Sequence, residues 1–490
     1  MTPVDLDFLA VAPEVLLAAG ALAVLGVDLL WRPQPRWWGI VAAVSLVAAI
    51  AASVLQWWEV AEREGAGLFF SGKIALDGYS AFGGIVMFSI AGLGLAAAWP
   101  LVLTLQRRGA EFVALVLIAA AGFHVMAASA DLILLFLGLE TASISLYVIA
   151  GFIRDRAAAD EAALKYFLLG AFASAVFLYG IALFYAGTGT TSLVDGGDYL
   201  RNNILLEPGV LLIGVGLMIV GLGFKVSAVP FHLWAPDVYQ GAPGGIVGYM
   251  VAAAKIGGFA GLGRVLSIGV GPFVDDWGPA VAVIAALSLV VGTALAIAQT
   301  DMKRMLAYSG IAHAGFILTA LVAAGDGLPA MWFYVATYSF QVIAAFAVAA
   351  VVSGAAGGPS PLSDYAGLST RSPLLAATLM VAMLAMGGIP LLTGFVGKVG
   401  VWQAAIDADY LWLVIVGVLS TVAGLFFYLR VIVLMYLQAP AVAAAPGTVR
   451  ARPEAGLAVR FAMLVAVAVT VVFGVVPWPL LDVVADALPF

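Results

Sequence analysis

Long apolar runs, separated by short polar connections, follow one another along almost the whole chain. Each run reaches the length of about 20 residues that a helix needs to cross the hydrocarbon core of a bilayer. The pattern therefore predicts an all-α polytopic membrane protein with about fourteen transmembrane helices and no soluble domain. The predicted helices lie near residues 8–30, 37–58, 77–103, 111–129, 131–153, 162–187, 208–240, 244–269, 277–299, 303–324, 328–354, 373–406, 410–437 and 458–482.

Two of these runs are broken by a proline, and the first break lies within residues 217–241. This segment places Lys225 in an apolar helix and then reaches Pro230 and His232. A charged side chain at the centre of a membrane helix costs about 2.5–3.5 kcal/mol. A proline also frees backbone groups that lipid cannot satisfy. Because broken helices with charges line ion pathways in transporters, we expect this segment to form part of an ion path.

The second break contains Gly387, Gly388 and Pro390, and Lys398 follows it in the same run. Glycine and proline are common in membrane helices, so an ordinary kink is the alternative interpretation. The lysine favours a functional break.

The two breaks also indicate an internal repeat. Asp131 precedes the fifth predicted helix as Asp301 precedes the tenth, and Pro230 breaks the seventh as Pro390 breaks the twelfth. Each block has five helices, so the second block must be inverted in the membrane. The predicted division is three helices in 1–110, a first five-helix repeat in 111–269, an inverted second repeat in 277–437, and a loop and last helix in 438–490.

Composition supports the membrane assignment and excludes several kinds of site. The chain is 64% hydrophobic and 10% charged, whereas soluble domains carry about 25% charged residues. It has no cysteine, which excludes disulfides and thiolate metal sites. The three histidines show no metal-ligand spacing, and no phosphate loop or dinucleotide fingerprint is present. We therefore expect no metal, no bound cofactor and no nucleic-acid partner. The N-terminus is acidic and lacks the basic start of a signal peptide, so we expect the first apolar run to be retained.

Most cations lie in alternate connections. The larger group follows odd-numbered spans and comprises Arg32, Arg36, Arg107, Arg108, Arg154, Arg156, Lys303, Arg304, Arg371, Arg430, Arg450, Arg452 and Arg460. The smaller group follows even-numbered spans and comprises Arg63, Lys73, Arg201 and Arg264. The positive-inside rule therefore predicts that the odd-to-even loops face the cytoplasm and that both termini lie outside.

The four remaining cations are lysines inside predicted spans: Lys165, Lys225, Lys255 and Lys398. The chain has only six lysines against 15 arginines, so this placement is selective. Arginine keeps its proton in proteins, whereas a desolvated lysine can release one. The pattern favours lysines that load and unload protons. The alternative is a lysine that extends to the membrane surface, which fits Lys165 best.

Glu140 is the candidate acidic partner of these lysines, because it lies in the middle of the fifth span. An intramembrane carboxylate needs a partner, and a membrane lysine is the obvious one. Separating such a pair, or protonating the glutamate, would lower the proton affinity of the lysine. A static structural ion pair is the alternative.

Three further groups near the breaks are candidates for proton transfer or for local structure. His232 adjoins the first break and either relays protons or hydrogen-bonds freed carbonyls. His313, in the tenth span, either relays protons or satisfies a neighbouring helix, with the relay favoured. His124 is expected to be structural, and Asp237 is expected to cap a helix or anchor a loop.

Four segments of the chain together resemble a known family: FKVSAVPFHLWAPDVYQGAP, VAAAKIGGF, DMKRMLAYSGIAHAGF and IPLLTGFVGKVGVW. They resemble the antiporter-like subunits of respiratory complex I, the bacterial NADH–quinone oxidoreductase, over about residues 110–437. Val-Tyr-Gln-Gly-Ala-Pro and the context of Lys398 favour the subunit N group over the L and M groups. The chain departs from the family at Gly244-Gly245-Ile246-Val247-Gly248, where a Thr- or Ser-bearing helix start is usual.

The resemblance implies fourteen transmembrane helices, two inverted five-helix repeats and a place in a bacterial plasma membrane. It implies a proton path through Glu140, Lys225, Lys255 and Lys398, with Lys165 modulating Lys225. It also implies partners among the other membrane-arm subunits, including other antiporter-like subunits. NADH, FMN, iron–sulfur clusters and quinone would belong to the complex and not to this chain.

The resulting hypothesis is proton translocation driven by quinone reduction elsewhere in such a complex. Protons would load Lys225 from the cytoplasm, cross through Lys255 and possibly His313, and leave from Lys398 toward the outside. One alternative is a subunit of a multisubunit cation/proton antiporter, although a sodium site would favour further intramembrane carboxylates. Another is a passive scaffold in a membrane-bound hydrogenase complex, against which the buried lysines argue.

Overall fold

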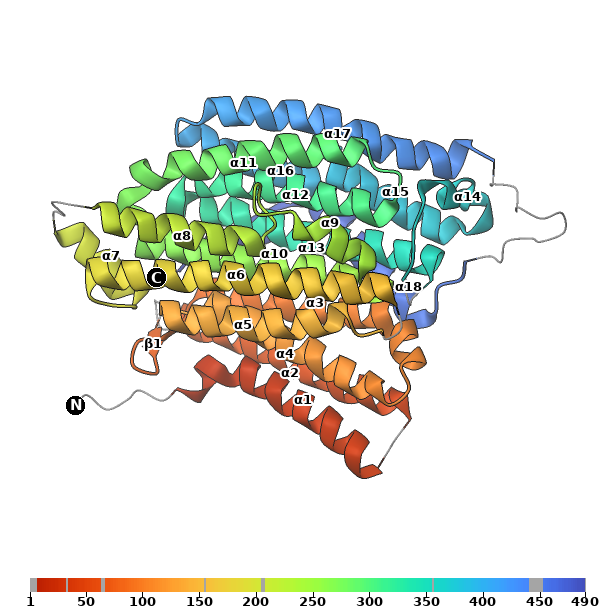
Figure 1. Ribbon diagram of the computed structural model, residues 1–490, viewed down its shortest axis with the longest axis horizontal. Coiled ribbons are helices and arrows are strands. Elements are labelled where there is room, and N and C mark those ends of the chain that lie inside the picture. Colours follow the sequence, from red (N-terminus) through yellow and green to blue (C-terminus); the bar gives the residue numbers. More distant parts are fainter. Residues whose placement is uncertain are drawn as a thin grey trace.

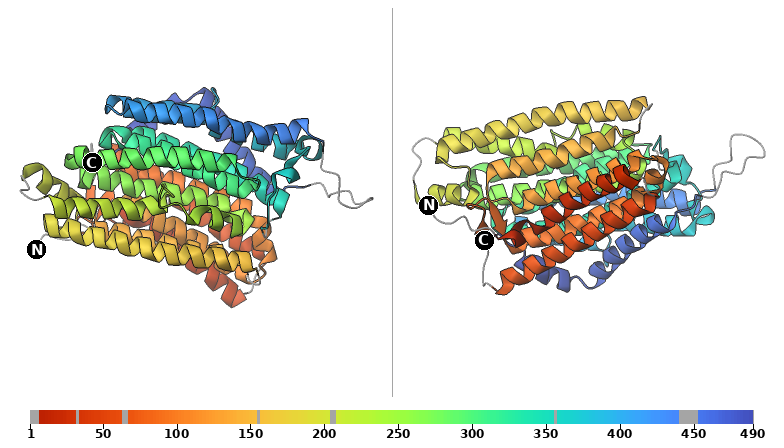
Figure 2. Two further views of the ribbon diagram at one scale, coloured as in Figure 1. Left: turned by 45° about the horizontal axis from the view of Figure 1, so that its top comes forward. Right: turned by 90° about the horizontal axis from the view of Figure 1, so that it is seen from below.

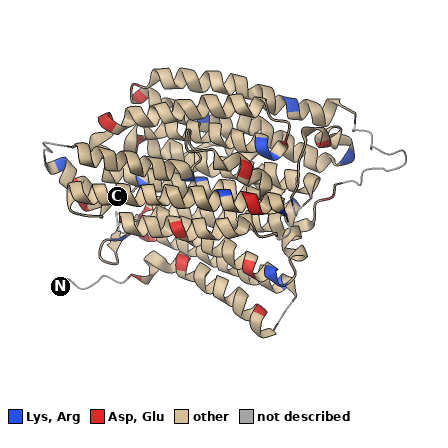
Figure 3. Cartoon of the chain, in the orientation of Figure 1, with Lys and Arg blue, Asp and Glu red and all other residues tan. Residues whose placement is uncertain are grey.

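The chain folds into a bundle whose helix axes run side by side (Figure 1). The computed structural model describes residues 7–31, 34–62, 67–153, 156–203, 208–354, 357–439 and 453–489. The helices α1 and α2 form one edge of the bundle and α17 forms the opposite edge (Figure 1). Charged residues are few over the whole bundle, and some of them lie along its middle (Figure 3).

The first part of the chain forms four long helices and one hairpin. Its elements are η1 (Phe8–Val11), α1 (Ala12–Trp31), α2 (Pro35–Glu62), β1 (Gly67–Phe69), β2 (Ile74–Leu76), α3 (Gly78–Thr104) and α4 (Arg108–Ala128). The two strands are antiparallel, with Gly67 opposite Leu76, and they connect α2 to α3.

The next block contains the first break. Its elements are α5 (Leu132–Ala150), α6 (Ala157–Thr188), α7 (Leu193–Asn202), α8 (Gly209–Lys225), α9 (Trp234–Gly241), α10 (Gly244–Arg264), η2 (Val265–Gly269) and η3 (Gly271–Phe273). Every residue of α10 is buried, and this helix packs against α3, α4 and α13 at the centre of the bundle.

The last part contains the second break. Its elements are α11 (Val274–Ile297), α12 (Met302–Leu321), η4 (Ala324–Gly327), α13 (Leu328–Ser353), η5 (Leu362–Tyr365), α14 (Leu368–Arg371), α15 (Pro373–Gly387), α16 (Thr393–Asp407), α17 (Leu411–Leu437), α18 (Leu457–Val475) and α19 (Trp478–Asp486). The helix α18 packs one face against α13 and α3. Figure 2 gives two further views of the bundle.

The all-α polytopic class is confirmed. Among the described residues, 11 helices are long and apolar enough to cross a membrane. The other three predicted spans correspond to α12 and to the broken pairs α8–α9 and α15–α16, whose apolar first halves are shorter. The count of fourteen, the block boundaries and the orientation of the termini stay predictions. Five cations used for that orientation, Arg32, Arg63, Arg154, Arg450 and Arg452, lie outside the described residues.

A shared backbone pattern supports the relation between the two blocks. The carboxylate of Asp131 caps α5, and its backbone bridges to Ser192. The carboxylate of Asp301 caps α12, and its backbone bridges to Pro361. Each aspartate thus fixes the start of the corresponding helix by the same two devices, a side-chain cap and an antiparallel contact with a later loop.

A buried ion pair joins the first helices to α10. Arg264 donates to Asp77 over 2.7 Å, and both side chains are almost completely buried. Arg264 also donates to the carbonyl of Ala127, and its guanidinium lies 4.9 Å from the ring centroid of Tyr79. The charge pattern of the sequence predicts Arg264 among the cations of a connecting loop. The structure instead places it inside the bundle, where the carboxylate and the carbonyl compensate the loss of hydration.

Candidate functional site

Lys225 is the last residue of α8 and is buried at the first break, with 2% of its surface exposed. Its Nζ donates to the Oγ of Ser143 on α5 over 2.8 Å and lies 5.0 Å from the ring centroid of Phe123. The amine therefore meets a hydroxyl and an aromatic face, both of which accept a cation without removing its mobile proton.

Glu140 lies one helical turn before Ser143, on the same face of α5. Its carboxylate accepts a hydrogen bond from Ser174 of α6 and attracts the ammonium of Lys225. The described side chains of Glu140 and Lys225 form no direct ion pair, and each contacts a serine hydroxyl instead. Their functional partnership stays a prediction. This arrangement leaves the lysine sensitive to the charge of the glutamate without locking the pair together.

Lys255 reaches the same break from the central helix α10. Its Nζ donates to the carbonyl of Val226 over 3.1 Å, directly after Lys225 in the chain. Helix ends leave their last carbonyls without intrahelical partners, and these carbonyls favour a nearby cation. The break thus brings two buried lysines to one helix end.

Lys398 makes the corresponding contact at the second break. Its Nζ donates to the carbonyls of Met386 and Gly387 over 3.2 Å each, at the end of α15. The same Nζ lies 4.6 Å from the ring centroid of Phe316. The chain can turn away here because Gly388 adopts a positive φ of 82°, which glycine tolerates at no steric cost. In both breaks, carbonyls freed at the end of the first half-helix hold a lysine from another helix.

His313 stands between the two lysine sites in a cluster of hydroxyl groups. Its Nδ1 lies 2.8 Å from the hydroxyl of Tyr334, and its Nε2 lies 3.1 Å from that of Tyr428. The hydroxyl of Tyr428 lies 2.5 Å from Ser309 Oγ, and the imidazole stacks on Tyr338 at 4.4 Å. The positive charges of Lys255 and Lys398 both act on the imidazole. An imidazole between two hydroxyls can accept a proton on one nitrogen and release one from the other.

The other two histidines differ in their surroundings. His232 is buried in the first break, and its Nδ1 has no hydrogen-bond partner among the described residues. His124 lies among the first helices, where its Nδ1 is 2.8 Å from Glu14 and its Nε2 is 3.1 Å from the carbonyl of Ser80. These contacts tie α1, α3 and α4 together, which agrees with a structural role for His124.

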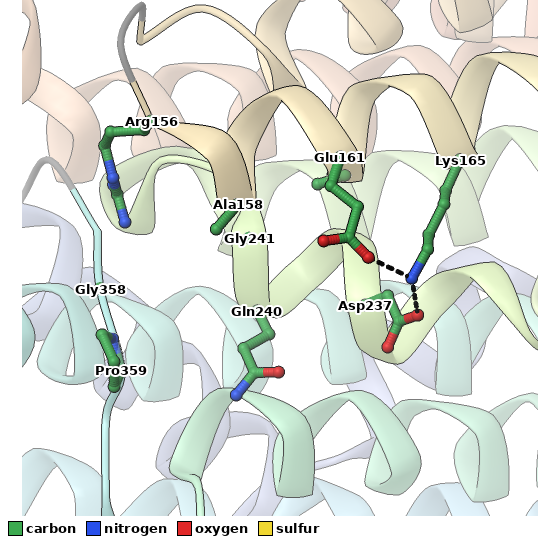
Figure 4. A pocket seen from close by; sticks show the side chains of 10 residues that line it. Arg156, Ala158, Glu161, Lys165, Asp237, Gln240, Gly241, Gly358 and Pro359 are labelled. Carbon is green, nitrogen blue, oxygen red and sulfur yellow. Dashed lines mark hydrogen bonds and ion pairs between the residues drawn. The ribbon is translucent and has the colours of Figure 1, made fainter.

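Lys165 lies apart from the buried lysines, at the end of the bundle that we predict to face the cytoplasm. Its side chain is 41% exposed, and its Nζ lies 2.7 Å from both Glu161 and Asp237. The other oxygen of Asp237 lies 2.6 Å from Arg304 of α12. A pocket of about 210 Å³ is lined by Lys165, Glu161 and Asp237, which Figure 4 shows converging on it. Asp237 caps no helix, since α9 has no side-chain cap.

The glycine-rich departure at the start of α10 has a packing role. The helix begins at Gly244 without a side-chain cap, so the hydrogen bond of a Thr or Ser start is absent there. A Cβ on Gly245 would lie 3.1 Å from the Cα of Ala98, which is closer than most real contacts. Glycine therefore lets α10 approach the backbone of α3 closely.

Comparison with known proteins identifies the family. The NADH:quinone oxidoreductase/Mrp antiporter transmembrane family matches residues 129–424. The chain is 38% identical to NADH-quinone oxidoreductase subunit N 1 of Solibacter usitatus over 89% of both chains. It is 45% identical to subunit N of Mycobacterium tuberculosis over 78% of this chain and 72% of that one. The chain belongs to the NADH:quinone oxidoreductase/Mrp antiporter family.

Solved structures agree with this assignment. A chain of Thermus thermophilus respiratory complex I with bound aureothin superposes with a TM-score of 0.80 and 33% identity, covering 96% of this chain and 98% of that one. A chain of the Dietzia Mrp complex superposes with a TM-score of 0.83 at 21% identity, covering 98% of this chain and 97% of that one, which shows a shared fold alone. The resemblance drawn from the four sequence segments is confirmed at the level of the family.

Sequence reasoning missed the hydroxyl groups around the charged residues of this family member. Ser143 could have been found, because it lies three residues after Glu140 and so shares its helix face. Tyr334 and Tyr428 gave no such signal, since each lies in an apolar helix other than that of His313. Only the packing of α12, α13 and α17 brings them to the imidazole.

Proposed function

We propose that this chain is a proton-translocating membrane-arm subunit of NADH–quinone oxidoreductase. The relatives named above carry this assignment, and the Thermus chain belongs to a respiratory complex I. The single observation that supports the mechanism is the set of three buried lysines at two broken helices. All three are almost completely buried, and each contacts groups that stabilise a charge inside the bundle.

The first step of the proposed path loads Lys225. A proton reaches the first break from the polar end of the bundle, and the carboxylate of Glu140 favours the protonated amine. When Glu140 becomes neutral or moves away, this attraction is lost, and burial favours release of the proton. The hydroxyl of Ser143 keeps the amine in place through both states because it can donate as well as accept.

The second step moves the proton across the middle of the bundle. Lys255 of α10 contacts the carbonyl of Val226 at the end of the same half-helix, and it is the next proton acceptor. Gly310 lies between Lys255 and Tyr338: an added Cβ there would be 3.8 Å from the lysine Cε and 3.2 Å from the tyrosine hydroxyl. The small residue therefore keeps the route from Lys255 toward the His313 cluster open. Water would bridge the remaining gaps between the side chains.

The last step passes the proton from the His313 cluster to Lys398. Tyr334 contacts His313 and stacks on Phe316, whose ring faces the ammonium of Lys398. Release to the outside would follow loss of the proton at the second break. Direction and exit side rest on the charge pattern of the loops.

The driving force comes from neighbouring subunits in this proposal. NADH, FMN, iron–sulfur clusters and quinone would be held by partner chains. In the described part of this chain, no group of three or more His, Asp or Glu side chains is arranged to hold a metal ion. The role of this chain is to accept a change in charge or position from its neighbours and convert it into proton movement.

We expect the transported ion to be H⁺ and not Na⁺, because the charged residues at the two breaks are lysines, with Glu140 as the carboxylate beside them. Inverted membrane vesicles from a strain carrying this complex should acidify on addition of NADH. The initial rate should be the same in potassium and sodium buffers and should vanish with a protonophore. The same vesicles prepared without this chain should give no NADH-driven acidification.

A cation/proton antiporter subunit is the competing function, since the Mrp fold is shared. It predicts acidification that requires sodium and survives without NADH when a sodium gradient is imposed. That result would replace the present proposal.

A further inference from the structure

The carboxylate of Asp237 joins a cation of the first block to a cation of the second block, next to the first break. One oxygen lies 2.7 Å from Lys165 of α6, and the other lies 2.6 Å from Arg304 of α12. Arg304 also donates to Gln240 of the same short helix over 3.2 Å. The described end of α9 thus links α6 and α12 through charged contacts, in addition to the packing of α9 against both helices.

The same short helix is attached to the Lys225 site by aromatic contacts. Trp234 donates from its indole nitrogen to the carbonyl of Phe224 over 3.1 Å, one residue before Lys225. Its ring stacks on Tyr166 at 4.5 Å and 8°, and the ammonium of Lys225 lies 5.8 Å from the Tyr166 ring. A displacement of α9 therefore changes the surroundings of Lys225 directly.

On the other side, Arg304 belongs to the helix that carries the central cluster. It lies in the first turn of α12, the helix that also bears Ser309 and His313. Movement of α12 along its axis would pull Arg304, and through Asp237 it would pull α9. Asp237 contributes to neutralising both cations. Lys165 also forms an ion pair with Glu161, and Arg304 also donates a hydrogen bond to Gln240.

We propose that Asp237 is a positioning residue that ties proton loading at Lys225 to the position of α12. The inference rests on the proposed function and adds how the two blocks communicate at the predicted cytoplasmic end. Many exposed ion pairs contribute nothing measurable. This one differs because a single carboxylate bridges two helices and its own helix contacts the proton-loading site.

The test compares single and double charge removals in the intact complex. Asp237→Asn and Arg304→Gln are each expected to lower NADH-driven acidification about three- to tenfold, because coupled contacts carry interaction energies of this size. The double variant should lose less than the product of the two single losses. Asp237→Glu should restore most of the rate, which a purely packing role would not produce.

A matched control is the exposed pair of Asp198 and Arg201 on α7, which also lies at 2.7 Å. Asp198→Asn and Arg201→Gln should leave acidification unchanged. Wild-type acidification by Asp237→Asn, losses that multiply in the double variant, or failure of Asp237→Glu to recover would each overturn the inference. Lys225→Ala is assayed in parallel: if it also pumps normally, the proposed function fails and not merely the role of Asp237.

Discussion

Replacing Lys225 by alanine is expected to reduce NADH-driven proton pumping about tenfold or more, since loss of a positioned proton-transfer group typically costs a factor of 100 or more. The variant keeps the break in the helix and the hydroxyl of Ser143 but removes the one amine that Glu140 attracts. Quinone reduction coupled to pumping should fall with it. The measurements are acidification of inverted vesicles and NADH–quinone activity of the same membranes.

Lys73→Ala is the matched control for this experiment. Lys73 is an exposed lysine in the turn of the β1–β2 hairpin, so the same substitution there removes a solvated charge only. Pumping should be unchanged, and the amount of assembled complex should be equal in both variants. A Lys225→Ala complex that assembles and pumps at the wild-type rate would contradict the proposed path.

Replacing Asp77 by alanine is expected to destabilise the chain by about 3–5 kcal/mol, because it leaves the buried guanidinium of Arg264 without its carboxylate. Asp77 also accepts from the backbone of Ser80 and thereby starts α3, so the cap is lost as well. The complex should show a lower thermal midpoint in mild detergent and a smaller amount in the membrane.

Removing both charges at once distinguishes the loss of the Asp77–Arg264 ion pair from the loss of the α3 cap. The double variant Asp77→Asn with Arg264→Met retains a side chain that can cap α3 and buries no unpaired charge, so most of the stability should return. Equal thermal midpoints for wild type and Asp77→Ala would show that Arg264 finds other compensation inside the bundle. The experiment is independent of the pumping mechanism, since it concerns how α3 and α10 are joined.

The sequence predicted the membrane class and the charged residues because both follow from strong local signals. Apolar runs of membrane length are unmistakable, and a lysine in such a run is costly enough to be informative. Asp131 and Asp301 were recognised as related positions, and the structure shows the same capping and bridging around both. The roles of the lysines and of Glu140 stay predictions that the geometry supports.

The contacts of the site that the sequence did not predict are those formed by the packing of different helices. The contact of Lys398 with the end of α15 depends on how α16 folds back beside it. The surroundings of His313 depend on side chains from two other helices, Tyr334 of the next helix α13 and Tyr428 of the remote helix α17. Likewise, Arg264 was wrongly predicted to lie in a loop, because its carboxylate partner Asp77 lies 187 residues earlier in the chain, before the first repeat. Spacing along one helix carries no information on such contacts.

The central claim is that a buried amine must change its protonation state, and Lys225→Arg tests it most directly. Arginine preserves the positive charge and the attraction to Glu140 but does not release its proton in a protein. The account predicts that vesicles with the Lys225→Arg complex assemble normally and lose NADH-driven acidification to the same extent as Lys225→Ala. Acidification at the wild-type rate would show that only a fixed charge is needed at this position, and the account would be contradicted.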